Sequence, residues 1–528
     1  MGLPRVDEAA EVIEEVFENL VDQFSDPFTF YRELIQNAMD AGSNQVEVSC
    51  VYDEKVQRVC VTVADSGEGM SEKIIEEQLT KLFSSTKEHD LTKIGKFGIG
   101  FVSIFAIQPE CVVLDTGRDG NYWRVVFPGS TQYFLYRLEA PVEGTSIRLF
   151  KRLPAVGWPE FLQRSEDTIR YWCGYSETQV CFNGRLLNLQ LAVESPCSVE
   201  VSGPGTRAVI GMSAEGLPEF GMYNHGLTLK QGREALLPGL TFRIKSNYLE
   251  HTLTRDNVIV DKHYHKAMAI LNRAAEHDLV EAFAARVDAL QGQLPERLEE
   301  LEMLMQSATN WLSHRPKLLN KLAIRPLLPT HHHGLVSLRE LKSKGFLEGA
   351  LYYDLVSGVV TEALARENVP VLWGQASAEI IRLYCPRSVY KANHVVACPQ
   401  PLEKSQLPQG WERVASSMRE YLRLGEHRLN GIQLADFDYN GSCVQGLACL
   451  AEPKPGQATR LFHRGVWRNL SFYPGRLLLN HRHSLVMQAL SKHQEHPEIC
   501  AYALSKAALL QDGLPQDMES KMLKRCWS

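Results

Sequence analysis

The chain has 528 residues, which is too long for a single hydrophobic core and predicts several domains. Hydrophobic residues make up 44% and charged residues 23%, as in ordinary globular proteins, and the formal net charge of -7 disfavours whole-chain binding to nucleic acid or an acidic membrane. No apolar run reaches the roughly 18 residues of a membrane-spanning helix, and the N-terminal segment has no signal-peptide core, so we expect no membrane association. The twelve cysteines include no Cys-x-x-Cys pair, which favours reduced thiols and a cytoplasmic location.

The N-terminal region begins with two helical patterns. Residues 6–22 have the spacing of an acidic amphipathic helix, and a second helix is expected over 28–41, with Asp26 as its cap and Pro27 at its start. Apolar residues then alternate over 46–50 and 59–63, as in two strands of a hairpin. Further strands are expected at 111–114, 123–127, 133–138 and 146–150. This order predicts an α+β fold, with helices on one face of a mixed or antiparallel sheet.

The remaining chain divides less clearly. Strand-like segments at 208–212 and 241–244 precede a long helical stretch at 262–289, and a polar helix is expected over 296–310. Beyond residue 316 the pattern is mixed α/β. We therefore expect four parts: a first domain over 1–188, a second α/β domain over 189–290, a helical connector over 291–315 and a C-terminal region over 316–528.

The helix expected over 28–41 has a polar face whose side chains are suited to catalysis and to metal binding. At about 100° per residue, Glu33, Asn37 and Asp40 share one face, while apolar residues occupy the opposite face. Glu33 is suited to accept a proton from an attacking water, and Asn37 offers the oxygen ligand that Mg²⁺ prefers. The simpler alternative is an amphipathic helix with a solvated polar face.

A strand and a turn follow at 63–70. The strand ends at Asp65, and Gly67 and Gly69 allow a tight turn or a close approach to a ligand. The carboxylate of Asp65 can accept a hydrogen bond from an exocyclic amine such as that of adenine. The alternative is an ordinary polar turn, since Asp and Gly are common turn residues.

Three glycines, Gly95, Gly98 and Gly100, precede an apolar helix-like run. Backbone amides at a helix N-terminus form an anion site suited to phosphates. The preceding polar segment, 84–90, has the composition of a mobile lid. Neither the dinucleotide-binding glycine pattern nor the P-loop pattern is present.

The order and spacing of these motifs resemble the Bergerat nucleotide site of the GHKL superfamily. The superfamily's N box resembles residues 33–40, its glycine boxes resemble 65–70 and 95–101, and the strand start at 143–147 resembles its adenine-supporting threonine segment. The resemblance implies an N-terminal Bergerat-type α/β sandwich, a second, transducer-like α/β domain and a mixed α/β C-terminal region. It also implies ATP and Mg²⁺ as cofactors.

The resemblance assigns roles residue by residue. Glu33 would be the general base, and Asn37 would hold Mg²⁺. The remaining nucleotide-binding positions would be Asp40, Asp65, Gly67, Gly69, Met70, Lys87, Lys96, Gly98, Gly100, Phe101 and Thr145. Asp65 and Thr145 would read adenine, the glycines of the second box and Phe101 would wrap the phosphates, and Lys87 or Lys96 would assist from the lid.

Residues 30–37 and 95–103 look most like the HtpG-like branch of the ninety-kilodalton heat-shock chaperones. Residues 253–258 resemble the middle-domain segment of that branch whose arginine reaches the γ-phosphate, which makes Arg255 a second catalytic candidate. The alternative for Arg255 is a surface arginine at a helix start. The lid sequence 83–87 departs from the chaperone pattern, so the lysine that contacts phosphate is undecided.

The resemblance implies a Mg²⁺-dependent, slow ATPase that works as a conformational machine. ATP would close the lid and a homodimer, and protein clients are possible partners. Two alternatives use the same site: a nucleic-acid clamp of MutL or MORC type, which the acidic charge disfavours, and a non-catalytic nucleotide-sensing scaffold. Of two minor motifs, 331–333 is interpreted as a loop rather than a metal site, and 436–441 as an acidic turn.

Overall fold

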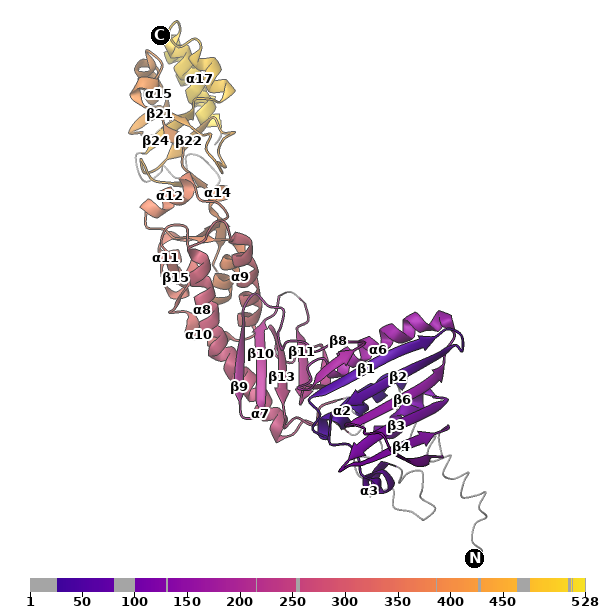
Figure 1. Cartoon of the computed structure of the whole chain (residues 1–528). Helices are drawn as coiled ribbons and strands as arrows, with labels where there is room; N and C mark the ends of the chain where they lie inside the picture. Colours follow the sequence, from indigo (N-terminus) through magenta and orange to yellow (C-terminus); the bar gives the residue numbers. More distant parts are fainter. Residues whose placement is uncertain are drawn as a thin grey trace, which may run out of the picture.

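The computed structural model describes residues 26–79, 100–129, 132–214, 216–252, 257–385, 387–425, 429–462, 475–510, 514 and 516–527. The described parts form an elongated molecule, with the N-terminal sheet at one end and the C-terminal helices at the other (Figure 1). The helix expected over 6–22 lies outside the described residues. The mixture of sheets and separate helices confirms the predicted α+β class.

The N-terminal sheet has eight strands in the order β5-β4-β3-β6-β2-β1-β7-β8. Neighbouring strands are antiparallel except β1 and β7, which are parallel. The strands are β1 (Gln45–Asp53), β2 (Arg58–Asp65), β3 (Cys111–Arg118), β4 (Asn121–Phe127), β5 (Phe134–Leu138), β6 (Thr145–Arg152), β7 (Gln179–Phe182) and β8 (Arg185–Leu186). The sheet is therefore mixed, which is one of the two forms that the sequence pattern allowed.

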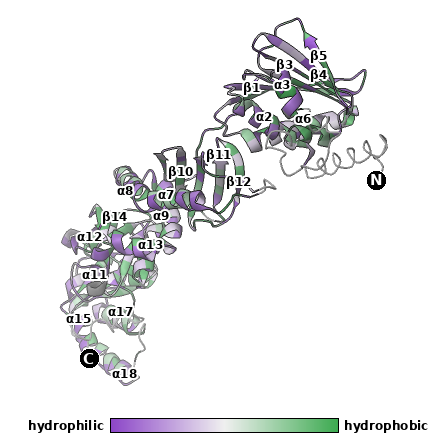
Figure 2. Ribbon diagram, turned by 90° about the horizontal axis from the view of Figure 1, so that it is seen from below, coloured by the Kyte–Doolittle hydropathy of each residue, from purple (hydrophilic) through white to green (hydrophobic). Residues whose placement is uncertain are grey.

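Helices cover one face of this sheet. The helices are η1 (Pro27–Thr29), α2 (Phe30–Asp40), α3 (Glu72–Ile74), η2 (Ile75–Leu79), η4 (Ser103–Ile107), η5 (Ala155–Gly157) and α6 (Trp158–Cys173). Figure 2 shows α2 and α6 on the same side of the strands. Val46, Val48, Val61 and Val63 point to this side and are buried against the helices, which explains the alternation in the sequence.

The helix expected over 28–41 has a distinct first turn. Asp26 Oδ1 accepts a hydrogen bond from the backbone N–H of Phe28 at 3.0 Å, and Pro27 opens the 3₁₀ turn η1. The α-helical part, α2, then runs from Phe30 to Asp40. The capping residue and the proline thus act where the sequence placed them.

A second sheet follows, with five strands in the order β12-β11-β13-β10-β9. They are β9 (Ser198–Gly203), β10 (Thr206–Met212), β11 (Glu219–Asn224), β12 (Leu227–Arg233) and β13 (Leu240–Ser246). Four helices come next: α7 (Lys262–Glu276), α8 (Asp278–Gln291), α9 (Leu298–Ser313) and α10 (Pro316–Leu322). The long helical stretch expected over 262–289 forms the two helices α7 and α8, which are divided at His277, whose φ of -124° and ψ of -68° leave the helical region.

The core of this part continues past the second sheet. Leu304, Met305 and Trp311 of α9 are buried in the same core as Phe242 of β13. The helix interpreted from its polar sequence as part of a connector therefore packs one face against the sheet. The same core extends to Val389.

A small parallel sheet, in the order β17-β16-β18, occupies the next segment. The elements are β14 (Pro326–Pro329), β15 (Leu335–Ser337), α11 (Leu338–Glu348), β16 (Leu351–Asp354), α12 (Val359–Arg366), β17 (Val371–Trp373), α13 (Gln375–Tyr384), β18 (Val389–Lys391) and α14 (Ala392–Val395). The three histidines at 331–333 lie in the β14–β15 loop, where the His331 ring stacks on Trp373 with centroids 3.6 Å apart. No group of three or more potential metal-ligating side chains occurs in the described part of the chain.

The C-terminal region contains a sheet in the order β20-β21-β24-β22. Its elements are β19 (Val396–Ala397), β20 (Gln400–Pro401), η6 (Lys404–Gln406), α15 (Trp411–Arg423), β21 (Gly431–Asp436), β22 (Cys449–Glu452), β23 (Thr459–Arg460), β24 (Arg476–Asn480), α16 (Ser484–Leu490), α17 (Pro497–Leu510) and α18 (Gln516–Cys526). The helices pack Trp411, Met418 and Leu504 against Leu477 of the sheet.

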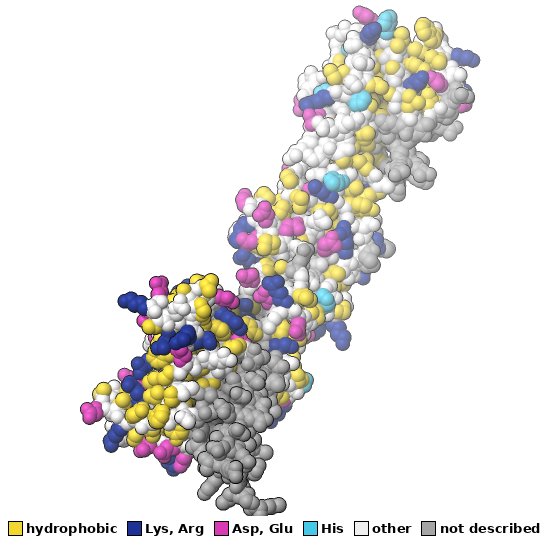
Figure 3. Space-filling view, turned by 90° about the vertical axis from the view of Figure 1, so that its right-hand side faces the viewer, with side chains coloured by type: hydrophobic (Ala, Val, Ile, Leu, Met, Phe, Trp, Pro, Cys, Tyr) yellow, Lys and Arg dark blue, Asp and Glu magenta, His cyan; other side chains and the backbone are white. Residues whose placement is uncertain are grey.

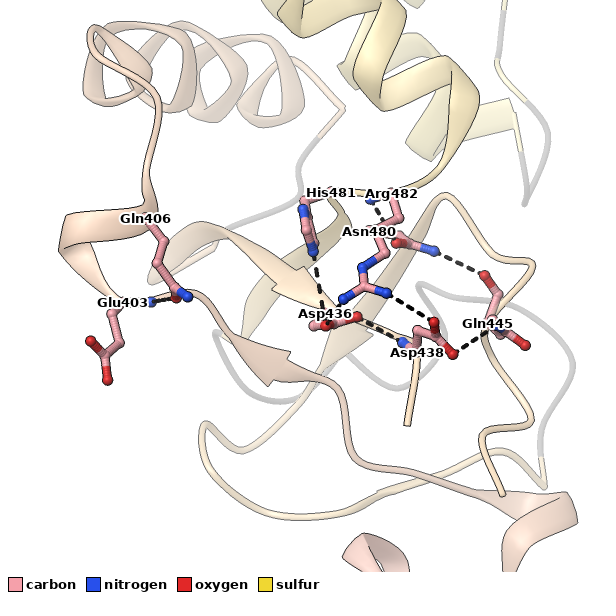
Figure 4. Close-up of polar contacts among 8 residues, drawn as sticks. All are labelled: Glu403, Gln406, Asp436, Asp438, Gln445, Asn480, His481 and Arg482. Carbon is pink, nitrogen blue, oxygen red and sulfur yellow. Dashed lines mark hydrogen bonds and ion pairs between the residues drawn. The ribbon is translucent and has the colours of Figure 1, made fainter. Parts of the chain in front are cut away.

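The acidic turn after β21 is held by one arginine (Figure 4). Because β21 and β24 are parallel neighbours, their carboxyl ends meet, and Arg482 donates hydrogen bonds to both Asp436 and Asp438 at 2.9 Å. Gln445 donates a further hydrogen bond to Asp438 at 2.8 Å. The carboxylates are thus engaged within the protein, which agrees with an acidic turn rather than a calcium loop.

All twelve cysteines are free thiols. Among the described helices, none has the length and apolar character needed to cross a membrane.

Candidate active site

The polar face of α2 runs from the protein interior to the surface. Glu33 is buried, with 2% of its surface exposed, Asn37 is half-buried, and Asp40 is exposed. Leu34, Ile35 and Ala38 lie in the core of the N-terminal sheet and hold the helix against it. The three polar side chains are therefore presented from one rigid element at increasing exposure.

Gly100 lies directly against Glu33. A Cβ atom on Gly100 would lie 2.9 Å from Glu33 Oε2, closer than real side chains tolerate. Only glycine lets this backbone approach the carboxylate so closely. Two of the predicted motifs, the N box and the second glycine box, thus meet at one point.

The side chain of Phe101 has a structural place. It is buried among the aromatic residues Phe105 and Phe127, with its ring centroid 5.4 Å from that of Phe127. Any contact of Phe101 with a phosphate would therefore use its backbone N–H. Lys87, Lys96, Gly98 and Arg255 lie outside the described residues.

Asp65 ends strand β2 opposite Thr145 of β6. Its Oδ1 accepts a hydrogen bond from the backbone N–H of Gly67 at 2.8 Å. Burial raises the pKa of the Asp65 carboxyl, and hydrogen bonds from Gly67 and Thr145 oppose that rise. This carboxylate is therefore desolvated and partly satisfied by the backbone, so it gains from a further hydrogen-bond donor.

The turn after Asp65 packs against the next strands. Gly69 has a φ of +69°, and a Cβ there would collide with the backbone oxygen of Gly117. The backbone N–H of Met70 donates to Thr116 Oγ1 at 2.9 Å, and the Met70 side chain packs against the core. Met70 is thereby fixed beside the ends of β2, β3 and β6.

The turn and α2 are joined directly. The N–H of Glu68 donates to the backbone oxygen of Ala41 at 3.0 Å, and a Cβ on Gly67 would lie 2.8 Å from Cβ of Ala41. The turn whose residues are expected to bind adenine and the helix whose residues are expected to act on phosphate are therefore joined by direct contacts.

The sequence reasoning missed Thr116. Its side chain is fully buried on β3, where its hydroxyl lies 3.0 Å from that of Thr145 and donates to the backbone oxygen of Gly144 at 3.1 Å. The expected strand stopped at residue 114, whereas β3 continues to Arg118. Pairing of β3 with β6 places Thr116 opposite Thr145.

Arg32 was also missed, because it reads as an ordinary charge in an amphipathic helix. The guanidinium is buried and lies over the ring of Trp172 at 4.6 Å. Burial lowers the pKa of Arg32 to about 10, so it stays cationic at neutral pH. It places a positive charge on α2 next to Glu33 in the chain.

Residues 29–122 match the family model described as histidine kinase-, DNA gyrase B- and HSP90-like ATPase. Residues 29–122 therefore form a GHKL-type ATPase domain. Relatives of this chain include chaperone protein HtpG of Wigglesworthia glossinidia brevipalpis, 30% identical over 159 residues, which are 24% of this chain and 24% of the relative. HtpG of Chlorobaculum tepidum is 26% identical over 207 residues, or 32% of each chain, and HtpG of Helicobacter hepaticus is 31% identical over 153 residues, or 23% and 24%. The chain thus matches about a quarter to a third of the length of these relatives.

Proposed function

We propose that the chain is an ATP-binding and ATP-hydrolysing conformational machine of the HtpG-like chaperone type. The observation that carries the proposal is the buried carboxylate of Glu33 in contact with Gly100. A general base needs a fixed position and a low-dielectric environment next to the phosphate-binding backbone. The burial of Glu33 and its contact with Gly100 support this role.

The other residues of the site have complementary roles. Asp65 accepts the exocyclic amine of adenine, Thr145 supports it, and Gly67, Gly69 and Met70 line the base pocket. Backbone amides of Gly98, Gly100 and Phe101 bind the phosphates, Asp40 lies at the outer end of the site, and Lys87 or Lys96 contributes from the lid. These roles follow the superfamily resemblance and the contacts of the described residues.

Asn37 is the proposed Mg²⁺ ligand. Its amide oxygen is a hard donor, and it stands half-buried one turn from Glu33. A single amide oxygen fits the needs of Mg²⁺, because this ion takes few protein ligands beside phosphate oxygens. When bound, the ion neutralises developing charge on the phosphates.

A tight contact of α6 and the turn that follows it with strands β11 and β12 of the second sheet supports coupling of ATP hydrolysis to domain movement. The rings of Tyr175 and Tyr223 lie 4.6 Å apart, and Thr228 Oγ1 donates to the backbone oxygen of Tyr171 at 2.6 Å. In our proposal, Arg255 reaches the γ-phosphate from the second domain and completes the site on closure.

The proposed homodimer uses the C-terminal helices. Ile499 and Leu510 on α17 and Trp527 after α18 are exposed by 47%, 56% and 81%. Hydrophobic side chains gather at this end of the molecule on the face shown in Figure 3. Ile499 and Leu510 are eleven residues apart, about three helical turns, so they share one face of α17. Two antiparallel copies would bury each Ile499 against the partner subunit's Leu510.

The test is ATP hydrolysis by the full chain and by Glu33→Ala, with ATP binding measured in parallel. We expect turnover to be lost and binding to be retained in Glu33→Ala. Glu54→Ala, in the exposed β1–β2 turn, is the control and should behave as wild type. Equal turnover in wild type and Glu33→Ala would contradict the mechanism. ATP binding without turnover in wild type would indicate a nucleotide-sensing scaffold instead.

A further inference from the structure

A cleft of about 710 Å³ lies in the middle of the molecule, away from the nucleotide site. Three elements line it: strand β9, the junction of α7 with α8, and helix α10. Its volume falls within the range of roughly 300–1,000 Å³ that is typical of ligand sites.

The cleft runs along the edge of the second sheet. Val199 and Glu200 are successive residues of β9, so their side chains point to opposite faces of the sheet, yet both line the cleft. A cavity that touches both faces of one strand lies beside its edge. Within the described residues, β9 pairs only with β10 and is the last strand of its sheet, as Figure 1 shows. Such an edge offers backbone donors and acceptors to another strand.

The charges of the cleft select its ligand. Four carboxylates and two cationic side chains line it. Arg325 binds Glu281 through two hydrogen bonds of 2.6 and 2.9 Å, and Arg207 pairs with Glu200 from outside the cleft. Glu276 and Asp278 are exposed at the helix junction and outnumber Lys321, the remaining cationic side chain of the lining, so the rim is acidic. Buried Leu318 and Leu322 form the apolar floor.

We propose that this cleft binds an extended polypeptide segment rich in basic and apolar side chains, which adds to β9 as a further strand. The idea deepens the proposed chaperone-type function, on which it rests for its biological meaning, by naming the chemistry of the client. Backbone hydrogen bonds to β9 supply affinity, and the acidic rim and apolar floor select side chains. Pairing of β9 with the β9 of a second copy is disfavoured, because it would bring two acidic rims together.

The probe is a fluorescein-labelled peptide of about ten residues that alternates lysine and valine, a length typical of a strand. Its anisotropy is measured with the full-length protein in the absence of nucleotide. Two further peptides serve as comparisons. One replaces lysine by glutamate, and the other carries N-methyl groups on alternate residues, which remove the backbone donors and keep the side chains.

We expect the lysine–valine peptide to bind and the other two to bind at least about tenfold more weakly. The double variant Glu276→Lys, Asp278→Lys should weaken binding by a similar factor, and high salt should reduce the difference. Glu296→Lys, Glu299→Lys is the matched control, since it also adds two lysines around the start of a helix but outside the cleft. This control should bind as wild type does.

Amide hydrogen exchange locates the peptide. Protection confined to residues 198–203 and the α7–α8 junction would support the proposal. Absence of binding, protection elsewhere, or equal binding of the N-methylated or glutamate peptide would overturn it. An equal effect of the control pair would do so as well. The same titration with Glu33→Ala separates the two proposals, because peptide binding needs no ATP turnover and the two sites belong to different sheets.

Discussion

The α-carbon of Gly100 faces the carboxylate of Glu33 so closely that a methyl group there would lie 2.9 Å from Oε2. Gly100→Ala would therefore push the carboxylate from its position while leaving its chemistry intact. We expect ATP turnover to fall by about a hundredfold, because small displacements of a catalytic group have effects of that size. ATP binding should change much less. Gly292→Ala, where the added methyl group meets no neighbour, is the control. Normal turnover in Gly100→Ala would show that Glu33 is not positioned by this contact.

Asp65→Asn tests the base pocket. Loss of a charged hydrogen-bond acceptor, worth roughly 1.5–3 kcal/mol, should weaken ATP binding by about 10–100-fold. Isothermal titration calorimetry measures this directly. Asn keeps the oxygen that accepts from Gly67, so the turn should stay folded.

The Asp65→Asn substitution should also change how the stability of the protein depends on pH. Burial raises the pKa of Asp65 above its ordinary value of 3.8, so the folded state binds the proton more tightly than the unfolded state. The stability that this proton provides is present below the unfolded pKa and is lost as pH rises through the folded pKa. Near pH 7, about three units above the ordinary value, ligand-free Asp65→Asn should be at least as stable as wild type. Its advantage should shrink as pH falls. A lower melting temperature of the variant near neutral pH would contradict the desolvation argument.

Thr116→Val removes the hydroxyl that accepts from Met70 and donates to Gly144. The N–H of Met70 and the carbonyl of Gly144 would each lose a partner, which should cost about 1–3 kcal/mol in urea unfolding of the N-terminal domain. ATP affinity should fall too, because Thr145 loses its neighbour. Thr62→Val, on the half-buried outer face of β2, should cost less than about 0.5 kcal/mol. Similar losses in both variants would mean that the hydroxyl of Thr116 has no special role.

These residues show what the sequence could predict. Glu33, Asn37 and Asp65 were proposed as site residues because each belongs to a short motif whose spacing is local. Thr116 was not found, because its role depends on the sheet order β3-β6-β2, which brings together residues that are far apart in the chain. The alternation at 46–50 and 59–63 predicted two strands correctly, since one face of the sheet is buried.

Two details of the predicted helices depend on tertiary packing in the same way. The stretch 262–289 contains neither proline nor glycine, so no local signal marks the break at His277. The polar sequence of 296–310 concealed a buried face, because only a third to a half of a helix surface needs to be apolar to pack on a sheet. Tertiary packing, rather than the local sequence pattern, determines both the break at His277 and the buried face of the helix at 296–310.

His331 predicts a pH dependence in the small parallel sheet. Burial lowers the pKa of His331 to about 4, below the ordinary 6.5, so its neutral form is favoured in the folded state. Stability is therefore present above pH 6.5 and is lost as pH falls from 6.5 towards 4. After allowance for solvent screening of the partly exposed ring, the loss should be about 1–2 kcal/mol.

Amide hydrogen exchange of β16 and β17, compared at pH 6.5 and near pH 4, measures this loss of stability. His331→Phe keeps a ring that can stack on Trp373 but cannot titrate, so its pH dependence should be smaller than that of wild type. His332→Phe, at an exposed neighbouring position, should keep the wild-type dependence. Identical pH dependence in wild type and His331→Phe would rule out His331 as its source.

The C-terminal dimer is tested by placing charges on α17. Ile499→Asp and Leu510→Asp should each raise the dimer dissociation constant by at least about a hundredfold, since each buries a carboxylate twice in a symmetric interface. Analytical ultracentrifugation measures the change. Met303→Asp, at an apolar position on α9 that is 59% exposed, controls for the loss of a surface hydrophobic residue. Both α17 variants should still bind ATP, because the proposed nucleotide site, apart from Arg255, belongs to the N-terminal region. A wild-type monomer, or a dimer unaffected by either α17 variant, would place the contact elsewhere or remove it from the mechanism.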